Sequence, residues 1–157
     1  MTPPTFLDAN VPIYAAGRPH PLKEPSAQVL VLAAERPGAF VTDAEVLQEM
    51  LHRYLALRLW PQGRQAFYHF ADLMRERVEA VLAADVEQAA RLADEHPELG
   101  ARDLLHTAVM QRLGVLRLVS ADAGFDRLSQ FERLDPIDVQ TWRDTLSDQG
   151  PRDRQRV

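Results

Sequence analysis

The sequence of 157 residues contains no cysteine, which excludes disulfide bonds and thiolate metal sites. Any metal ion must therefore be held by oxygen or imidazole ligands, and such ligands favour Mg²⁺ or Mn²⁺ over structural zinc. The sequence also lacks an apolar run near the roughly 18 residues that a membrane helix needs. Its first residues have neither a basic leader nor an apolar signal core. We therefore expect a cytoplasmic protein that does not contact a membrane.

Lysine is nearly absent as well, because Lys23 is the only lysine among the 18 Lys and Arg residues. Arginine suits bidentate contacts to phosphate, although a compositional bias of the genome would produce the same excess. The formal net charge of −5 argues against a protein that binds nucleic acid simply by being basic. It does not exclude a nuclease, because cations bound to a carboxylate cluster would remove most of that charge.

Length and composition indicate a single globular domain. Hydrophobic residues make up 46% of the chain and charged residues 26%, which are ordinary values for a domain with its own core. Nothing marks the start of a second domain, so we predict one domain over residues 1–147. Residues 148–157 are polar enough that we expect a flexible tail.

Predicted strands alternate with predicted helices along the chain. Apolar runs rich in β-branched and aromatic residues predict strands at residues 5–7, 39–42, 78–82, 115–120 and 131–134. Apolar residues recurring every three or four positions predict helices at residues 11–16, 26–35, 43–60, 64–74, 85–95, 101–113 and 138–146. This alternation is typical of the α/β class, with a mostly parallel sheet of four to five strands flanked by helices.

Local signals set several of these boundaries. We expect a proline-punctuated loop at residues 17–25, followed by Ser26 as a helix N-cap. Asp85 is a second expected N-cap, residues 61–63 are expected to break the long helix, and Gly114 should end the helix before it.

Four carboxylates are candidates for a shared site. Asp8 and Asp122 each follow a predicted strand, Glu49 lies in the long helix, and Asp103 lies in the first turn of a later helix. Taken singly, each has an ordinary explanation as a helix cap, a charge near a helix N-terminus or a solvated side chain. Taken together they indicate one shared site, because one fold could bring all four to the same edge of the sheet and ligands of a parallel sheet bind beyond the carboxyl ends of its strands.

A carboxylate cluster needs cations. Two carboxylates about 4 Å apart repel each other by roughly 4 kcal/mol at an effective dielectric constant of 20. Mg²⁺ and Mn²⁺ prefer such hard oxygen ligands, and they can activate water and stabilise the charge that grows on a phosphodiester during hydrolysis. The four carboxylates therefore point to metal-assisted cleavage of a phosphodiester.

The carboxylates stand in segments that resemble the motifs of PIN-domain nucleases, in order and at familiar spacing. The segments are Leu7–Asn10, Val46–Leu51, Arg102–Ala108 and Leu118–Asp126. The resemblance covers most of the chain and looks closest to the VapC-like toxins of bacterial type II toxin-antitoxin pairs. It implies a three-layer fold and a Mg²⁺- or Mn²⁺-dependent endoribonuclease. It also implies a homodimer and a small antitoxin protein as a partner.

The resemblance implies roles for individual residues. Asp8, Asp103 and Asp122 would ligate the metal, and Glu49 would ligate it or position the attacking water. Arg18, Arg53 and Arg102 are candidate RNA contacts, although a solvated helix face explains them as well.

Asn10, Ser120 and Gly124 also bear on this resemblance. Asn10 and Ser120 would support the site through hydrogen bonds. Many family members have another acidic residue two positions after that of Asp122, where this sequence has Gly124. A second metal ion is therefore less secure than the first, and we do not count Asp126 as a substitute.

Three other interpretations stay open. The chain would be a PIN-type nuclease that processes RNA without an antitoxin, or a protein-binding or dimerisation module with a partner surface on the apolar segment 54–60. A di-iron bundle is a remote alternative, because Glu49 and His52, and Asp103 and His106, are spaced three apart. A bundle would require four long helices and no sheet. We instead expect His52 and His106 to be packing or rim residues.

Overall fold

A computed structural model describes residues 2–146 and contains a sheet of five parallel strands in the order β3-β2-β1-β4-β5. The strands are β1 (Thr5–Leu7), β2 (Phe40–Asp43), β3 (Val78–Glu79), β4 (Arg117–Val119) and β5 (Glu132–Leu134). This sheet confirms the predicted α/β class and the predicted four to five strands. It also excludes the di-iron bundle, which requires a fold without a sheet.

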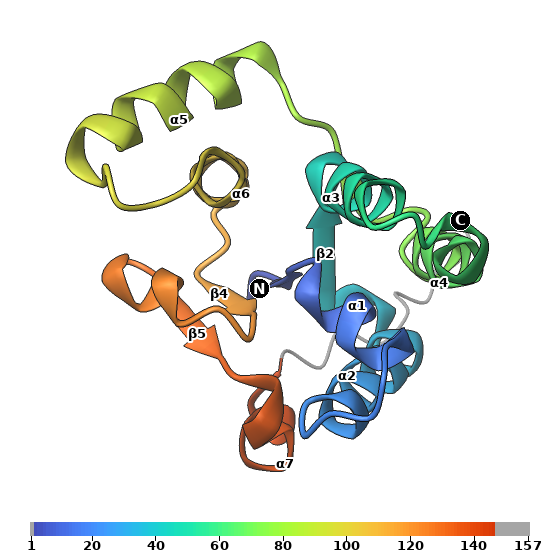
Figure 1. The fold of residues 1–157 in the computed structure, drawn as a ribbon. Coiled ribbons are helices and arrows are strands. Elements are labelled where there is room, and N and C mark those ends of the chain that lie inside the picture. The colour runs from blue at the N-terminus through green and yellow to red at the C-terminus, as the bar shows by residue number, and fades with distance from the viewer. Residues whose placement is uncertain (1, 147–157) are drawn as a thin grey trace, which may run out of the picture.

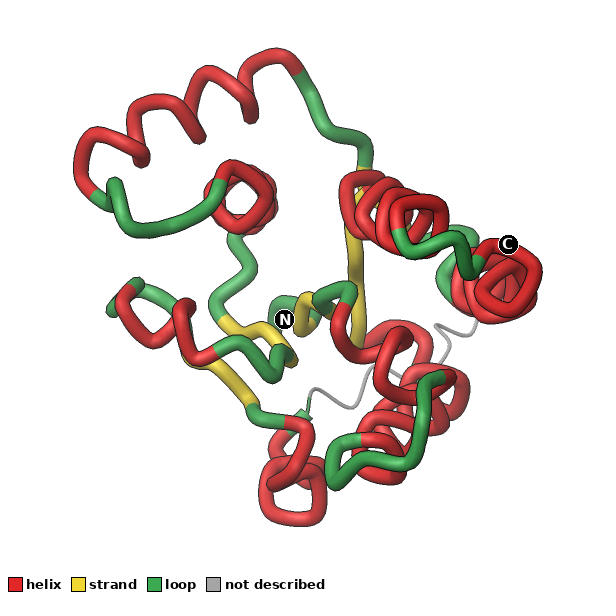
Figure 2. The backbone as a smooth tube through the Cα atoms, in the orientation of Figure 1, coloured by secondary structure: helices red, strands yellow, loops and turns green. Residues whose placement is uncertain are grey.

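Helices cover both sides of the sheet. They are α1 (Asn10–Ala16), α2 (Lys23–Glu35), α3 (Ala44–Ala56), α4 (Trp60–Leu73), α5 (Ala83–Glu95), α6 (Ala101–Leu113) and α7 (Val139–Trp142). Figure 1 shows α5 and α6 together on one side of the sheet and α1, α2 and α7 on the other, and Figure 2 shows the strands between these layers. The three-layer arrangement expected from the resemblance is therefore present.

Short 3₁₀ helices complete the described structure. They are η1 (Pro37–Ala39), η2 (Ala123–Arg127), η3 (Pro136–Asp138) and η4 (Arg143–Thr145). The helix predicted at residues 138–146 is thus shorter, with α7 flanked by η3 and η4. Among residues 2–146, no helix is long and apolar enough to cross a membrane. The tail predicted at residues 148–157 lies outside the described residues, and the domain boundary at residue 147 stays a prediction.

The central strands are buried along their whole length. All three residues of β1 and all four of β2 are buried, and Phe6 and Leu118 have no exposed surface. β1 pairs with both β2 and β4, and strands covered on both faces are expected to be continuously apolar. The residues that follow β1 and β4 are therefore carried to one edge of the sheet on rigid supports.

The start of α2 differs from the prediction. The helix begins at Lys23, and Ser26 is a buried residue inside it rather than the N-cap. Pro25 lies in the first turn, where a helical N–H has no partner within the helix and proline is tolerated. The loop predicted at residues 17–25 from its prolines is therefore too long, because α2 already begins at Lys23.

The break between α3 and α4 also lies elsewhere. It falls at residues 57–59, where Arg58 has a φ of 55°. Residues 61–63 lie inside α4 instead of breaking the helix, with Pro61 in its first turn. Gly63 is needed for close approach, because a Cβ at this position would lie 2.2 Å from Cγ of Tyr54.

Two further boundaries are corrected or confirmed near α5 and α6. β3 ends at Glu79 rather than residue 82, and α5 begins before Asp85. The Asp85 side chain accepts a hydrogen bond from the backbone N–H of Leu82 at 2.8 Å, from inside the first turn instead of the N-cap position. Gly114 ends α6 with a φ of 68°, as predicted.

Candidate metal centre

Asp8 follows β1 and is 4% exposed. One carboxylate oxygen, Oδ1, accepts a hydrogen bond from the backbone N–H of Ala9 at 2.7 Å. The other, Oδ2, accepts from Oγ of Ser120 at 2.7 Å and from Nδ2 of Asn10 at 3.2 Å. Burial raises the pKa of Asp8, although the charge of His106 and the hydrogen bond from Ser120 oppose this rise. The carboxylate is therefore held in place before any ligand arrives.

Ser120 and Asn10 join the ends of β1 and β4. The Ser120 hydroxyl donates to Asp8 and accepts from Nδ2 of Asn10 and from the backbone N–H of Asp122, each at 3.0 Å. Its single donor and both acceptor positions are thus used. Oδ1 of Asn10 accepts from the backbone N–H of Ala121 at 3.1 Å. These contacts are the supporting arrangement expected from the resemblance, and the roles of both residues in catalysis stay predictions.

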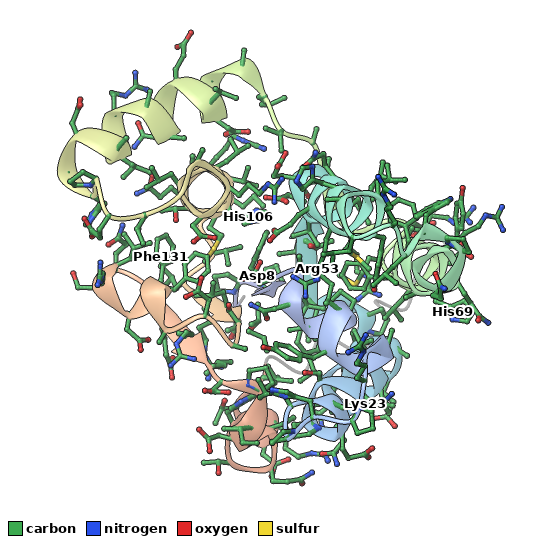
Figure 3. All side chains as sticks on the ribbon, in the orientation of Figure 1. Asp8, Lys23, Arg53, His69, His106 and Phe131 are labelled. Carbon is green, nitrogen blue, oxygen red and sulfur yellow. The ribbon has the colours of Figure 1, made fainter. Side chains whose placement is uncertain are left out.

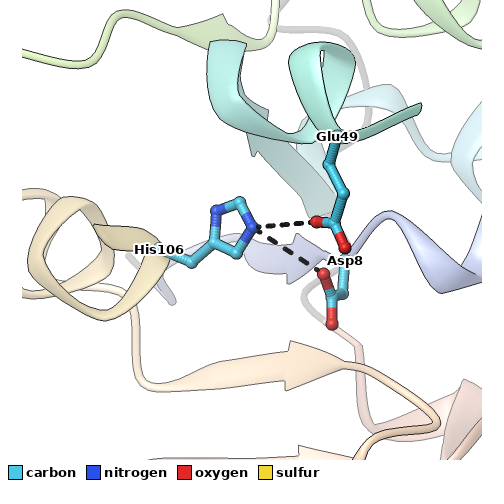
Figure 4. Close-up of side chains that lie close together, drawn as sticks. All are labelled: Asp8, Glu49 and His106. Carbon is cyan, nitrogen blue, oxygen red and sulfur yellow. Dashed lines mark ion pairs between the residues drawn. The ribbon is translucent and has the colours of Figure 1, made fainter. Parts of the chain in front are cut away.

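Glu49 reaches this site from α3. Its Oε2 lies 3.5 Å from Nε2 of His106, and an oxygen of Asp8 lies 3.9 Å from the same nitrogen (Figure 4). One ligand atom from each of the three residues lies within 4.8 Å of the others. Among the described residues, Oε2 of Glu49 and Nε2 of His106 are both buried without a hydrogen-bond partner.

Asp43 and His106 form a buried pair that sequence reasoning did not assign to the site. Both side chains have no exposed surface, and Nδ1 of His106 lies 2.8 Å from Oδ2 of Asp43. His106 also packs against Phe6, with ring centroids 5.3 Å apart, as expected of a packing residue. Figure 3 places Asp8 and His106 near the centre of the molecule. The sequence feature that could have identified His106 as a site residue is its three-residue spacing from Asp103, which puts both residues on the same face of α6.

The charge of His106 follows from its surroundings. Burial lowers the pKa of its imidazole, but the hydrogen bond to Asp43 and the nearby carboxylates of Glu49 and Asp8 raise it to about 10. Without a metal ion, the ring is therefore positively charged and partly offsets the negative charges around it.

Asp103 and Asp122 stand at the edge of this cluster. Burial raises the pKa of Asp103 to about 6, with further contributions from the charges of Asp8 and Asp122. Asp122 is exposed, and its Oδ1 accepts a hydrogen bond from the backbone N–H of Gly124 at 2.8 Å. The structure thus brings all four predicted carboxylates into one electrostatic neighbourhood, with Asp122 also serving as the cap of η2.

Asp126 is turned toward a different partner. Both of its oxygens accept hydrogen bonds from the guanidinium of Arg133, at 2.9 and 3.1 Å, and this contact lowers the pKa of Asp126. Asp126 is therefore engaged and exposed, which agrees with leaving it out of the predicted ligand set.

The arginines expected at the RNA surface differ in their surroundings. Nε of Arg102 lies 3.6 Å from Oε1 of Glu45, an ion pair between α6 and α3 close to the cluster. Arg53 is exposed on α3, and Arg18 is exposed in the loop after α1. Their contact with RNA stays a prediction.

The donor set fits a divalent cation. Carboxylates outnumber the one charged imidazole, and two of the three buried atoms without partners among the described residues, Oε2 of Glu49 and Nε2 of His106, lie 3.5 Å apart. A cation would bind Oε2 of Glu49 and offset the repulsion among the carboxylates, and it could also bind Nε2 of His106 once that nitrogen loses its proton. Asp8 and Glu49 supply the oxygen atoms of the group whose ligand atoms lie within 4.8 Å of one another, whereas Asp103 and Asp122 lie outside this group and their role as ligands stays a prediction.

Comparison with known proteins adds an independent line of evidence. Residues 5–130 match a family model described as the PIN domain. The chain is 44% identical over 120 residues to ribonuclease VapC23 of Mycobacterium tuberculosis, covering 74% of this chain and 91% of that protein. It is 38% identical over 129 residues to ribonuclease VapC13 of the same species, covering 82% of this chain and 98% of that protein.

A solved structure shares the fold at lower sequence identity. The structure of VapBC2 from Rickettsia felis, bound to a DNA fragment from its promoter, aligns with a TM-score of 0.63 and 19% identity. The alignment covers 83% of this chain and 97% of that chain. This chain therefore shares its fold with that structure.

Proposed function

This chain belongs to the PIN-domain family, and we propose that it is a metal-dependent endoribonuclease, the toxin of a toxin-antitoxin pair. The observation that carries the proposal is the buried Asp8, which lies with Glu49 and His106 at the carboxyl end of the central strand. Identities of 44% and 38% to two VapC ribonucleases support RNA as the substrate.

The residues of the site are arranged to hold a cation and a water molecule. Hydrogen bonds fix Asp8, and Asp103 and Asp122 add negative charge beside it. Glu49 keeps Oε2 without a partner among the described residues, so it can accept a hydrogen bond from a water molecule or ligate the cation. When bound, Mg²⁺ or Mn²⁺ would activate water and stabilise the negative charge developing on the phosphodiester.

Partner proteins are the second part of the proposal. Leu55, Leu57 and Leu59 are 53%, 54% and 37% exposed, whereas Tyr54 is buried. An exposed apolar segment of this kind suits a protein interface, and we assign it to an antitoxin or to a second copy of the chain. The binding-module interpretation thus coexists with the nuclease. We also place the protein in the cytoplasm, where its RNA substrate is found.

An RNA cleavage assay tests the proposal. Wild-type protein should cleave RNA with Mg²⁺ or Mn²⁺ and should lose activity with EDTA, and Asp8→Asn and Asp122→Asn should be inactive with either metal. Asp94→Asn is the matched control, because Asp94 is exposed on α5 and outside the cluster. Equal residual cleavage by the wild type and both site variants would refute the nuclease.

A nuclease that processes RNA without an antitoxin is the second candidate, favoured by the same catalytic geometry. The reading frame next to the gene separates the two, since a small antitoxin-like protein encoded there would favour the toxin. Purification of the chain as a complex with that protein would give the same answer directly.

A further inference from the structure

Nε2 of His106 is a buried nitrogen aimed at the carboxylates of the site. His106 has no exposed surface, and Nε2 lies 3.5 Å from Glu49 and 3.9 Å from Asp8 without a hydrogen-bond partner among the described residues (Figure 4). An unpartnered buried polar atom is costly unless something satisfies it. A ligand between the three side chains would do so.

Asp43 fixes the direction in which this nitrogen points. Because a carboxylate accepts hydrogen bonds, Nδ1 of His106 carries a proton and donates a hydrogen bond to Oδ2 of Asp43, 2.8 Å away. Oδ1 of Asp43 accepts from the backbone N–H of Val46 at 2.9 Å, so both oxygens of the carboxylate are engaged. The Phe6 ring packs against the imidazole from the side of the sheet. Nε2 is therefore directed into the site, and its proton must leave before this nitrogen can bind a metal ion.

We propose that Nε2 of His106 is a direct ligand of the bound metal and that Asp43 is the positioning residue behind it. This inference rests on the proposed function, because it concerns the cation of the same site. A carboxylate that holds the far nitrogen of a ligating histidine is a general device that orients the ring and raises its basicity. Asp43 has this relation to His106.

A nitrogen ligand has a consequence for the choice of metal. Mg²⁺ strongly prefers oxygen ligands, whereas imidazole is a ligand of the first-row transition metals, a series in which Mn²⁺ binds a given site most weakly. A site that combines His106 with the carboxylates of Asp8 and Glu49 therefore favours Mn²⁺ over Mg²⁺. The same carboxylates without His106 would discriminate less between the two ions.

The competing arrangement is a purely electrostatic one. In it, the imidazole keeps a proton on Nε2, remains a fixed positive charge beside Glu49 and Asp8, and never contacts the metal. The lone pair of Nε2 can hold a proton or a metal ion but not both. Direct observation of a metal–nitrogen bond therefore decides between the two arrangements.

Pulsed electron paramagnetic resonance on the full chain with one equivalent of Mn²⁺ makes that observation. The expected spectrum contains modulation from a directly bound nitrogen, which changes when the protein is prepared with ¹⁵N-labelled histidine. This test uses wild-type protein and so does not depend on whether a variant folds. His106→Gln should lose the modulation, and His52→Gln should keep it, because His52 is exposed on α3.

Metal titrations test the role of Asp43. Asp43→Asn retains an N-cap side chain for α3 but removes the carboxylate behind the histidine, and it should weaken Mn²⁺ binding about 10- to 100-fold. Mg²⁺ binding should weaken less, so the preference for Mn²⁺ should fall. An equal loss for both ions would assign Asp43 a structural role only and would overturn its positioning role.

The remaining outcomes separate this inference from the proposed function. Bound Mn²⁺ without nitrogen modulation, together with metal-dependent RNA cleavage, would overturn the His106 ligand and leave the nuclease intact. Loss of the modulation in His52→Gln would also overturn it. Failure to bind Mn²⁺ would overturn the His106 ligand, and failure to bind Mg²⁺ as well would overturn the metal-dependent mechanism.

Discussion

Neutralising Asp103 should stabilise the metal-free protein and abolish much of its response to metal. The pKa of Asp103 is raised from 3.8 to about 6, first by burial and then by the charges of Asp8 and Asp122. That rise corresponds to at most about 3 kcal/mol of destabilisation once the carboxylate is charged, and solvent screening of this half-buried group lowers the figure. Asp103 also lies in the first turn of α6, where a negative charge contributes about 0.3–1 kcal/mol. Asp103→Asn should therefore raise the free energy of unfolding by about 2 kcal/mol at pH 7.5 in EDTA.

The difference in unfolding free energy between Asp103→Asn and the wild type should depend on pH. Because the folded-state pKa of Asp103 lies above the unfolded value of 3.8, the folded protein binds the extra proton between these values. The stability that Asp103 contributes to the wild type is fully present below its unfolded pKa of 3.8 and is lost as pH rises through about 6. The difference between Asp103→Asn and the wild type should therefore be small near pH 4, grow up to pH 6 and remain constant above it.

Urea unfolding measures the effect with and without metal. At a Mn²⁺ concentration of 100 times the dissociation constant, wild type should gain about 2.7 kcal/mol, while Asp103→Asn should gain much less. Asp94→Asn on the exposed side of α5 is the control and should match the wild type in both conditions. A metal-free Asp103→Asn protein that is less stable than wild type at pH 7.5, or a difference independent of pH, would refute the electrostatic reasoning.

Three further predictions concern packing and hydrogen bonding. Gly63→Ala should lower the free energy of unfolding by about 1–3 kcal/mol, because its Cβ would overlap the buried Tyr54 ring; urea titration measures the loss. Arg112→Ala should cost about 2 kcal/mol, because it removes two hydrogen bonds to buried Asp85. Since Arg112 lowers the pKa of Asp85, this contribution should be present above pH 3.8 and disappear in acid. Ser120→Ala should cost about 1–3 kcal/mol and weaken Mn²⁺ binding in calorimetry, because buried partners of the hydroxyl are left unsatisfied.

The elements that sequence predicted well are those whose signals are local. β1 and β4 are short apolar runs that end in polar residues, and their buried, parallel pairing follows from that composition. The end of α6 was equally clear, because Gly114 alone supplies the left-handed conformation found there. The carboxylates that follow β1 and β4 were placed at the correct edge for the same reason.

The errors arose where a distant contact overrides a local signal. Pro61 and Gly63 read as a helix break, but the glycine lets α4 approach the Tyr54 ring and remain helical. The Asp43–His106 pair depends on the packing of α6 against the end of β2, between residues 63 positions apart. Periodicity contains no information about that contact, so neither residue could be distinguished from a cap or a packing residue.

The electrostatics of the metal-free site connect stability to metal choice. In the metal-free protein the raised pKa of His106 favours a proton on its ring, and this positive charge offsets part of the repulsion among Asp8, Asp43 and Glu49. Burial, followed by the charges of Asp8 and Asp122, raises the pKa of Asp103, so part of the repulsion among the carboxylates remains at this residue. A divalent cation that replaces the proton on Nε2 of His106 would bind this nitrogen. It would also reduce the repulsion among the carboxylates. If Mn²⁺ gains this nitrogen and Mg²⁺ does not, Mn²⁺ should stabilise the wild type more than Mg²⁺ at equal saturation, and His106→Gln should remove the difference.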